Sequence, residues 1–173
     1  MDIKKQLDKS IALVGMMGTG KSHIGRLLAQ ALDVPFCDSD QLVEAKAGMS
    51  VADVFERYGE EKFRESEHKT ILEVLDGVPC VLATGGGALM DGRTLEALKK
   101  HSYMVWLRSN PDVLWTRVSQ SQNRPLLNYP DAKDRLVALL AAREPLYAQA
   151  AIHVDNNVGD GQAVVAEIIK NIV

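Results

Sequence analysis

A glycine-rich stretch near the N-terminus, GMMGTGKS at residues 15–22, constrains this chain more than any other feature. It follows a short apolar run over 11–14, which predicts a buried parallel strand, and precedes an amphipathic segment over 24–32, which predicts a helix. The pattern G-x-x-x-x-G-K-[ST] between a strand and a helix is typical of a phosphate-binding loop (P-loop). Glycines let several backbone N–H groups point at one anion, and the helix N-terminus adds partial positive charge. We therefore expect a nucleoside triphosphate site here, rather than a turn that only joins strand to helix.

The residues of the P-loop are expected to have separate roles in binding the nucleoside triphosphate. The backbone of Gly18, Thr19 and Gly20 would surround the phosphates, and Lys21 would reach the outer ones. The Ser22 hydroxyl would ligate Mg²⁺, so Mg²⁺ is the expected cofactor of the bound nucleoside triphosphate.

Length and composition favour one domain over residues 1–173, with an ordinary soluble composition of 46% hydrophobic and 25% charged residues. A net charge of −3 disfavours a non-specific nucleic-acid surface. No signal-peptide pattern and no apolar run of about 18 residues is recognised, so we expect a cytoplasmic protein without a membrane partner. Cys37 and Cys80 are expected to be reduced residues of the core.

Short apolar runs alternate with segments of helical periodicity along the whole chain. This alternation predicts an α/β fold, a single-domain three-layer arrangement in which helices flank a five-stranded parallel sheet. Ligands of such folds gather at the carboxyl ends of the strands. The expected strands are 11–14, 35–37, 80–83, 103–107 and 152–154, and the expected helices are 21–32, 39–47, 50–57, 60–75, 91–100, 110–119, 132–149 and 160–172.

Two carboxylates, Asp38 and Asp40, follow the second expected strand. Residues two apart on an extended chain point to one side, so both could face the P-loop. One could then hold Mg²⁺ through water while the other contacts a hydroxyl and takes its proton. The alternative is that Asp38 or Ser39 only caps the helix that begins near Gln41.

Two further features have both a functional and a structural interpretation. Arg64 lies four residues after Glu60 and three before Glu67, a spacing that also fits a solvated ladder of salt bridges. Gly85, Gly86 and Gly87 follow the third expected strand, where bare backbone indicates either the close approach of a ligand or a tight turn.

The segment over 119–131 is polar at one end and contains two prolines, which indicates an exposed mobile lid. In the helix expected after it, Pro145 should bend or end the helix.

Taken together and in this order, these motifs resemble those of the shikimate kinase family, small P-loop kinases related in fold to the nucleoside monophosphate kinases. The resemblance covers roughly residues 11–155 and rests on 15–22, FCDSD at 36–40, FRESE at 63–67, GGG at 85–87, RPLL at 124–127 and REPLY at 143–147.

The resemblance implies transfer of the γ-phosphoryl group of ATP to the 3-hydroxyl of shikimate, with Mg²⁺. It implies that Asp40 binds substrate hydroxyls and is the base, and that Arg64 and Arg143 hold the substrate carboxylate. It implies that Gly86, with its neighbours Gly85 and Gly87, contacts the ring hydroxyls.

The same resemblance implies the remaining roles. Lys21 and Arg124 would be catalytic cations, with Arg124 coming from the lid onto the phosphates, and Asp38 would join Ser22 in the magnesium shell. Glu67 would orient Arg64. The segment 39–75 would then carry the substrate-binding helices.

The chain departs from the family pattern on the ATP side. His23 stands where the family usually has Thr, and the loop over 155–159 lacks the Arg that often stacks on adenine. Arg117 is the residue that matches the other adenine-side position. The expected ATP-binding residues are Gly18, Thr19, Gly20, Lys21, Ser22, His23, Arg117 and Arg124.

Two alternative functions remain open at this point. A P-loop kinase could instead phosphorylate gluconate, another carboxylated polyol, or a nucleoside monophosphate. A nucleotide-binding module without catalysis is disfavoured by the intact Lys21, Ser22, Asp38, Asp40 and Arg124. The expected partners are ATP and shikimate, with no nucleic acid or membrane, and we expect a monomer.

Overall fold

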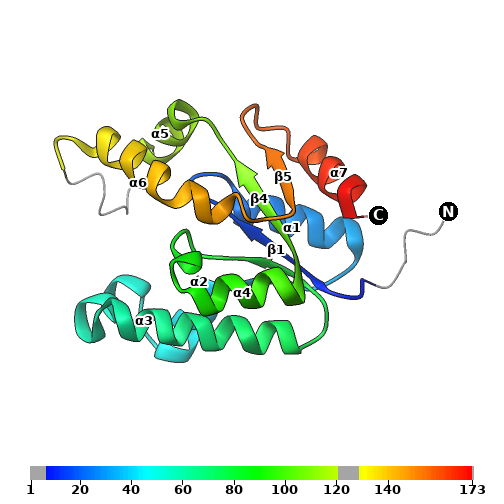
Figure 1. Cartoon of the computed structure of the whole chain (residues 1–173), viewed down its shortest axis with the longest axis horizontal. Coiled ribbons are helices and arrows are strands. Elements are labelled where there is room, and N and C mark those ends of the chain that lie inside the picture. Colours follow the sequence, from blue (N-terminus) through cyan, green and yellow to red (C-terminus); the bar gives the residue numbers. More distant parts are fainter. Residues whose placement is uncertain (1–6, 121–128, 173) are drawn as a thin grey trace.

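Five parallel strands form one sheet. In Figure 1 the sheet lies at the centre of the molecule, with helices around it. The computed structural model describes residues 7–120 and 129–172. The strand order is β2-β3-β1-β4-β5, so the central strand β1 pairs with β3 on one side and β4 on the other. The bounds are β1 Ser10–Val14, β2 Phe36–Asp38, β3 Val81–Ala83, β4 Ser102–Arg108 and β5 Ile152–Asp155.

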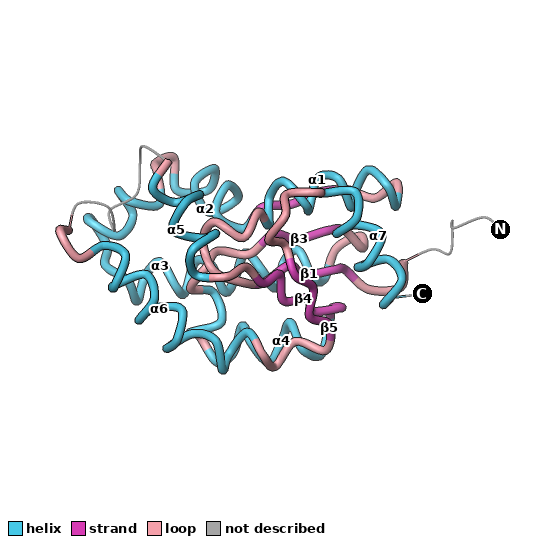
Figure 2. The backbone as a smooth tube through the Cα atoms, turned by 90° about the horizontal axis from the view of Figure 1, so that it is seen from above, coloured by secondary structure: helices cyan, strands magenta, loops and turns pink. Residues whose placement is uncertain are grey.

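Helices cover both faces of this sheet, so the predicted three-layer α/β fold is confirmed (Figure 2). Their bounds are α1 Lys21–Leu32, α2 Ser39–Ala47, α3 Val51–Asp76, α4 Gly92–His101, α5 Pro111–Ser119, α6 Ala132–Tyr147 and α7 Gly161–Ile172, with a 3₁₀ turn, η1, at Ala88–Met90.

Alternate residues of β1 supply two separate cores. Ile11 and Leu13 pack with α1 and α7 on one face, whereas Ala12 and Val14 pack with α3, α4 and α6 on the other. All four side chains are fully buried, as expected for a central parallel strand covered on both sides. This packing fixes the end of β1, and with it the start of the P-loop.

Several element boundaries differ from those predicted. The second strand is Phe36–Asp38 instead of 35–37, and the helix expected over 132–149 ends at Tyr147. The two helices expected over 50–57 and 60–75 are both present, since α3 consists of two helical parts that meet at a kink at Gly59, where φ is 81° and ψ is 170°. Glycine adopts this extended conformation with positive φ without steric cost, so the chain changes direction there between the two helical parts. Pro145 lies inside α6, which ends two residues later.

Two other expectations can be compared with the described residues. Cys37 and Cys80 are both free thiols; Cys80 is buried in the core as predicted, whereas Cys37 is partly buried and packs against it. Within 7–120 and 129–172, no helix combines the length and the apolar character that crossing a membrane would need.

The α1–sheet contact predicts a large packing effect at Leu28, which is fully buried. Leu28→Ala should lower the free energy of unfolding by about 2–5 kcal/mol, because it leaves a cavity in a close-packed core. Leu72→Ala on α3 is the matched control, since Leu72 is 36% exposed and should lose far less. Equal denaturation midpoints for the two variants would contradict this description of the core.

Candidate active site

The P-loop curves around the side chain of Lys21. Gly18 and Gly20 have φ values of 83° and 89°, so the chain can turn tightly between β1 and α1. Lys21 is buried, and its Nζ donates hydrogen bonds to the carbonyl oxygens of Gly15 at 2.7 Å and Met16 at 2.9 Å. A positive charge is thereby held within the loop at the carboxyl end of β1.

Ser22 and Asp38 meet beside the P-loop, although 16 residues separate them. The Ser22 hydroxyl donates to Asp38 Oδ2 at 2.8 Å. Asp38 Oδ1 accepts from the backbone N–H groups of Asp40 and Gln41, so it also caps α2. The functional and the capping interpretations of Asp38 are therefore compatible.

The Ser22–Asp38 pair has the donor chemistry that Mg²⁺ prefers. A hydroxyl and a carboxylate supply hard oxygen ligands, and protein-bound Mg²⁺ commonly takes the rest from phosphates and water. Among the described residues, no group of three or more His, Cys, Asp and Glu side chains gathers as a metal cluster. The two oxygens fit a magnesium ion that is shared with a nucleotide.

The geometric argument for Asp40 was wrong, because the chain is not extended there. It turns into α2 at Ser39, so Asp38 ends the strand while Asp40 lies in the first helical turn. Asp40 nevertheless lies near the charges of the site. Burial raises its pKa, the nearby Asp38 carboxylate raises it further, and Lys21 and Arg64 oppose the shift. A carboxylate with a raised pKa is a better proton acceptor.

Charged side chains occupy the space next to the glycines after β3, Gly85–Gly87, where a side chain on these residues would lie. A Cβ atom on Gly85 would lie 2.8 Å from Asp40 Oδ1 and 3.0 Å from Glu67 Oε2. A Cβ on Gly87 would overlap the Arg64 guanidinium. Gly86 lies between Arg143 and the P-loop, since its Cβ would be 3.5 Å from both Arg143 Nη1 and the Met17 amide nitrogen.

This segment therefore brings together four charged side chains from α2, α3 and α6, and it places them next to the P-loop. These are Asp40, Arg64, Glu67 and Arg143.

The Arg64–Glu67 pair is buried rather than a solvated ladder. Arg64 Nη1 lies 2.7 Å from Glu67 Oε1, and the two side chains are 16% and 1% exposed. The contact with the exposed Glu60 is longer, at 3.7 Å. Burial raises the pKa of Glu67, while Arg64 acts in the opposite direction. Glu67 therefore fixes the direction of the Arg64 guanidinium.

Tyr147, one turn after Arg143 on α6, is a further residue of this cluster. Its hydroxyl donates to the carbonyl oxygen of Gly86. Burial raises the pKa of Tyr147, and Arg143 opposes the rise. Tyr147 thus anchors the glycine segment to α6. The i, i+4 spacing places Tyr147 on the same face of α6 as Arg143, whereas its contact with Gly86 exists only in the folded structure.

The residues expected to bind ATP differ in how they lie relative to the P-loop. Arg117 donates through Nη1 to the carbonyl oxygen of Gly18 at 3.1 Å and through Nη2 to that of Asn156 at 2.9 Å. His23 is exposed on α1. Arg124 and most of the expected lid lie outside the described residues, so their roles stay predictions. Asn156, which sequence reasoning gave no role, donates through Nδ2 to the Thr19 carbonyl oxygen at 2.8 Å.

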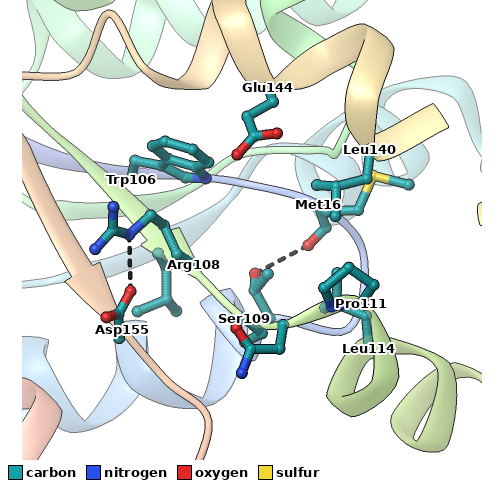
Figure 3. Close-up of a pocket in the computed structure, with 12 residues that line it drawn as sticks. Met16, Trp106, Arg108, Ser109, Pro111, Leu114, Leu140, Glu144 and Asp155 are labelled. Atoms are coloured by element: carbon teal, nitrogen blue, oxygen red, sulfur yellow. Dashed lines mark hydrogen bonds and ion pairs between the residues drawn. The ribbon is translucent and has the colours of Figure 1, made fainter. Parts of the chain in front are cut away.

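A pocket of about 330 Å³ lies at the carboxyl ends of β4 and β5 (Figure 3). Met16 and Thr19 of the P-loop line it together with Trp106 and residues of α6. An ion pair joins Arg108 to Asp155 at 2.7 Å on its wall. Lys21, Asp40, Arg64 and Arg143 are not among its lining residues. The pocket is therefore a hollow beside the P-loop, separate from the charged cluster at the glycine segment.

Comparisons with known proteins show the family of this chain. The family model described as shikimate kinase matches residues 17–173. A shikimate kinase of Ruegeria pomeroyi is 42% identical over 167 residues, which cover 96% of this chain and 84% of that protein. The chain belongs to the shikimate kinase family.

Solved structures place this family member among enzymes of the same kind. The structure of shikimate kinase from Acinetobacter baumannii in complex with shikimate superposes with a TM-score of 0.91 at 35% identity, covering 96% of this chain and 94% of that one. A gluconokinase from Sinorhizobium meliloti superposes with a TM-score of 0.64 at 18% identity, covering 97% and 93% of the two chains. The second likeness shows a shared fold and nothing about the substrate.

The raised pKa of Asp40 predicts a stability cost that depends on pH. The folded protein holds this proton more tightly than the unfolded chain, so the ionised carboxylate destabilises the fold above the folded-state pKa. The cost should disappear as the pH falls toward 3.8, the ordinary pKa of an aspartate side chain, where the unfolded chain also becomes protonated.

Asp40→Asn should therefore raise the thermal midpoint at about pH 8, and the gain should shrink as the pH is lowered through the folded-state pKa. Scanning calorimetry over this range measures the effect, with Asp76→Asn on the exposed end of α3 as control. A gain that is absent at high pH, or that grows as the pH falls, would contradict the assignment.

Proposed function

We propose that this protein transfers the γ-phosphoryl group of ATP to the 3-hydroxyl of shikimate, giving shikimate 3-phosphate and ADP. One observation carries the proposal in a chain of this family. Two guanidinium groups, Arg64 and Arg143, and one carboxylate, Asp40, converge on Gly85–Gly87 directly beside the P-loop. A carboxylated polyol needs these complementary groups next to a bound triphosphate.

Arg64 and Arg143 are proposed to bind the substrate carboxylate. A guanidinium presents a planar fork of donors that matches a planar carboxylate, so charge-assisted bonds fix both position and orientation. Glu67 already holds Arg64 at 2.7 Å, which reduces the ordering that substrate binding requires. The bare backbone of Gly85–Gly87 lets a flat ring approach closely.

Asp40 is proposed to bind the ring hydroxyls and to accept the proton of the attacking one. Its raised pKa suits this role, and its carboxylate lies near Lys21. Lys21 would neutralise charge on the transferred phosphoryl group, and Arg124 would add a second cation from the segment 119–131. Magnesium held at Ser22 and Asp38 would supply further charge neutralisation on the phosphates. Phosphoryl transfer requires mainly such positioning and charge.

The remaining assignments follow from the same proposal. The segment 39–75 would form the substrate-binding part of one kinase domain spanning 1–173, and 119–131 would close over ATP and exclude water. ATP and shikimate would be the partners of a cytoplasmic monomer.

Gluconate is the alternative that the fold leaves open, because it is also a carboxylated polyol. ADP release should be measured with shikimate, gluconate and AMP in parallel, each with and without Mg²⁺. We expect turnover with shikimate alone and only in the presence of Mg²⁺. Turnover with gluconate or AMP instead would overturn the substrate assignment, and turnover with none would indicate a nucleotide-binding module.

Two arginine variants test whether Arg143 binds the substrate carboxylate. Arg143→Ala should weaken shikimate binding by about 2–5 kcal/mol, because the bound carboxylate loses a charge-assisted partner. The KM for shikimate should therefore rise by a factor of about 30 or more, while the KM for ATP stays near the wild-type value. Arg93→Ala is the control, since Arg93 pairs with Glu65 and Asp91 on the surface. Equal rises in both KM values for Arg143→Ala would indicate a structural role.

A further inference from the structure

Asn156 lies in the loop after β5 and is locked in place by its main chain. Its amide N–H donates to the Arg108 carbonyl oxygen at 2.7 Å. Its own carbonyl oxygen accepts from the Ser109 hydroxyl at 2.7 Å and from Arg117 Nη2 at 2.9 Å. Asn156 is only 6% exposed. The backbone of the loop after β5 is therefore held in one position, and so is the start of the Asn156 side chain.

The Asn156 side chain contacts the P-loop. Its Nδ2 donates to the carbonyl oxygen of Thr19 at 2.8 Å, across 137 residues of sequence. Arg117 Nη1 donates to the preceding carbonyl, that of Gly18, at 3.1 Å. Two successive carbonyl groups of the P-loop thus each accept a hydrogen bond, one from Arg117 and one from Asn156.

Holding a carbonyl also fixes the direction of the next amide. The peptide unit is planar and trans, so its C=O and N–H groups point in opposite directions. When Asn156 holds the Thr19 carbonyl, the Gly20 N–H is directed away from Asn156. Among the hydrogen bonds between described residues, none uses the Gly20 N–H. That donor is available to an anion held in the loop.

The local geometry shows that Gly20 and Asn156 are fitted to each other. A Cβ atom on Gly20 would lie 3.0 Å from Asn156 Nδ2, so any side chain there would crowd the amide. The Asn156 Oδ1 atom is buried and has no hydrogen-bond partner among the described residues. A buried unpaired oxygen is unfavourable, so the favourable contact of this amide is the hydrogen bond from its Nδ2 to Thr19.

We propose that Asn156 is a positioning residue for the nucleotide: it fixes the Thr19–Gly20 peptide so that the Gly20 N–H faces the β-phosphate. The inference rests on the proposed function only in that the P-loop binds a nucleotide. Without Asn156 the peptide can rotate, and the loop must be ordered again each time that a nucleotide binds.

Three variants separate this role from simple packing. Asn156→Ala removes the side chain, whereas Asn156→Leu keeps a similar volume and removes both the donor and the unpaired oxygen. Asn156→Asp keeps the shape and cannot donate. Asn157→Ala is the neighbouring control, because the Asn157 side chain accepts from the Asn110 amide and does not touch the P-loop carbonyls.

Isothermal titration with Mg²⁺ present should show ADP affinity falling about tenfold in all three Asn156 variants, and AMP affinity, measured by competition, changing less than about twofold. AMP lacks the β-phosphate that the Gly20 N–H would bind. The affinity for shikimate should stay unchanged, and Asn156→Leu should be at least as stable to heat as Asn156→Ala. Asn157→Ala should bind ADP like the wild type.

Normal ADP affinity in Asn156→Leu would overturn the proposal, since its donor is gone while the fold is kept. Equal losses for ADP, AMP and shikimate would also overturn it and assign Asn156 to packing. Neither measurement depends on which acceptor is phosphorylated. A wild-type protein that binds ADP but does not phosphorylate shikimate would refute the proposed function and leave this test intact.

Discussion

The buried ion pair between Arg64 and Glu67 is the interaction on which the substrate side of the site depends. Glu67 is almost completely buried beneath Gly85, and removing Arg64 would leave its charge uncompensated. The same guanidinium occupies the space beside Gly87, and it opposes the upward shift of the Asp40 pKa. One pair therefore connects α3, the glycine segment and the carboxylate proposed as base.

The ionised carboxylates of the site do not stabilise the fold. Burial raises the pKa values of both Asp40 and Glu67 in spite of the nearby cations, so these carboxylates cost stability when they are ionised. The stability comes from elsewhere, from the two apolar cores on either face of β1. Those cores hold the loop ends rigidly enough for the polar groups to be placed against one another.

Features that are encoded in a short local pattern could be predicted from the sequence. The roles of residues that depend on burial or on contacts between distant segments were predicted less well. The P-loop, the parallel sheet and the glycine segment follow from short motifs and periodicity. The spacing of Arg64 and Glu67 could not distinguish a solvated pair from a buried one, because exposure is set by α3 packing under Gly85. Asp40 was placed by a rule for extended chains that fails one residue earlier, at Ser39. Asn156 had no motif, since its contact with Thr19 exists only in three dimensions.

Arg64 and Arg143 are proposed to bind the substrate carboxylate, so that a substrate hydroxyl faces Asp40 and the P-loop. The most direct measurement compares kcat/KM for shikimate with that for its methyl ester, which keeps the ring and hydroxyls but loses the negative charge. We expect the ester value to be lower by about a hundredfold or more, since the charge-assisted bonds to Arg64 and Arg143 are lost. Values for acid and ester that agree within about threefold, a difference of under 1 kcal/mol, would contradict it.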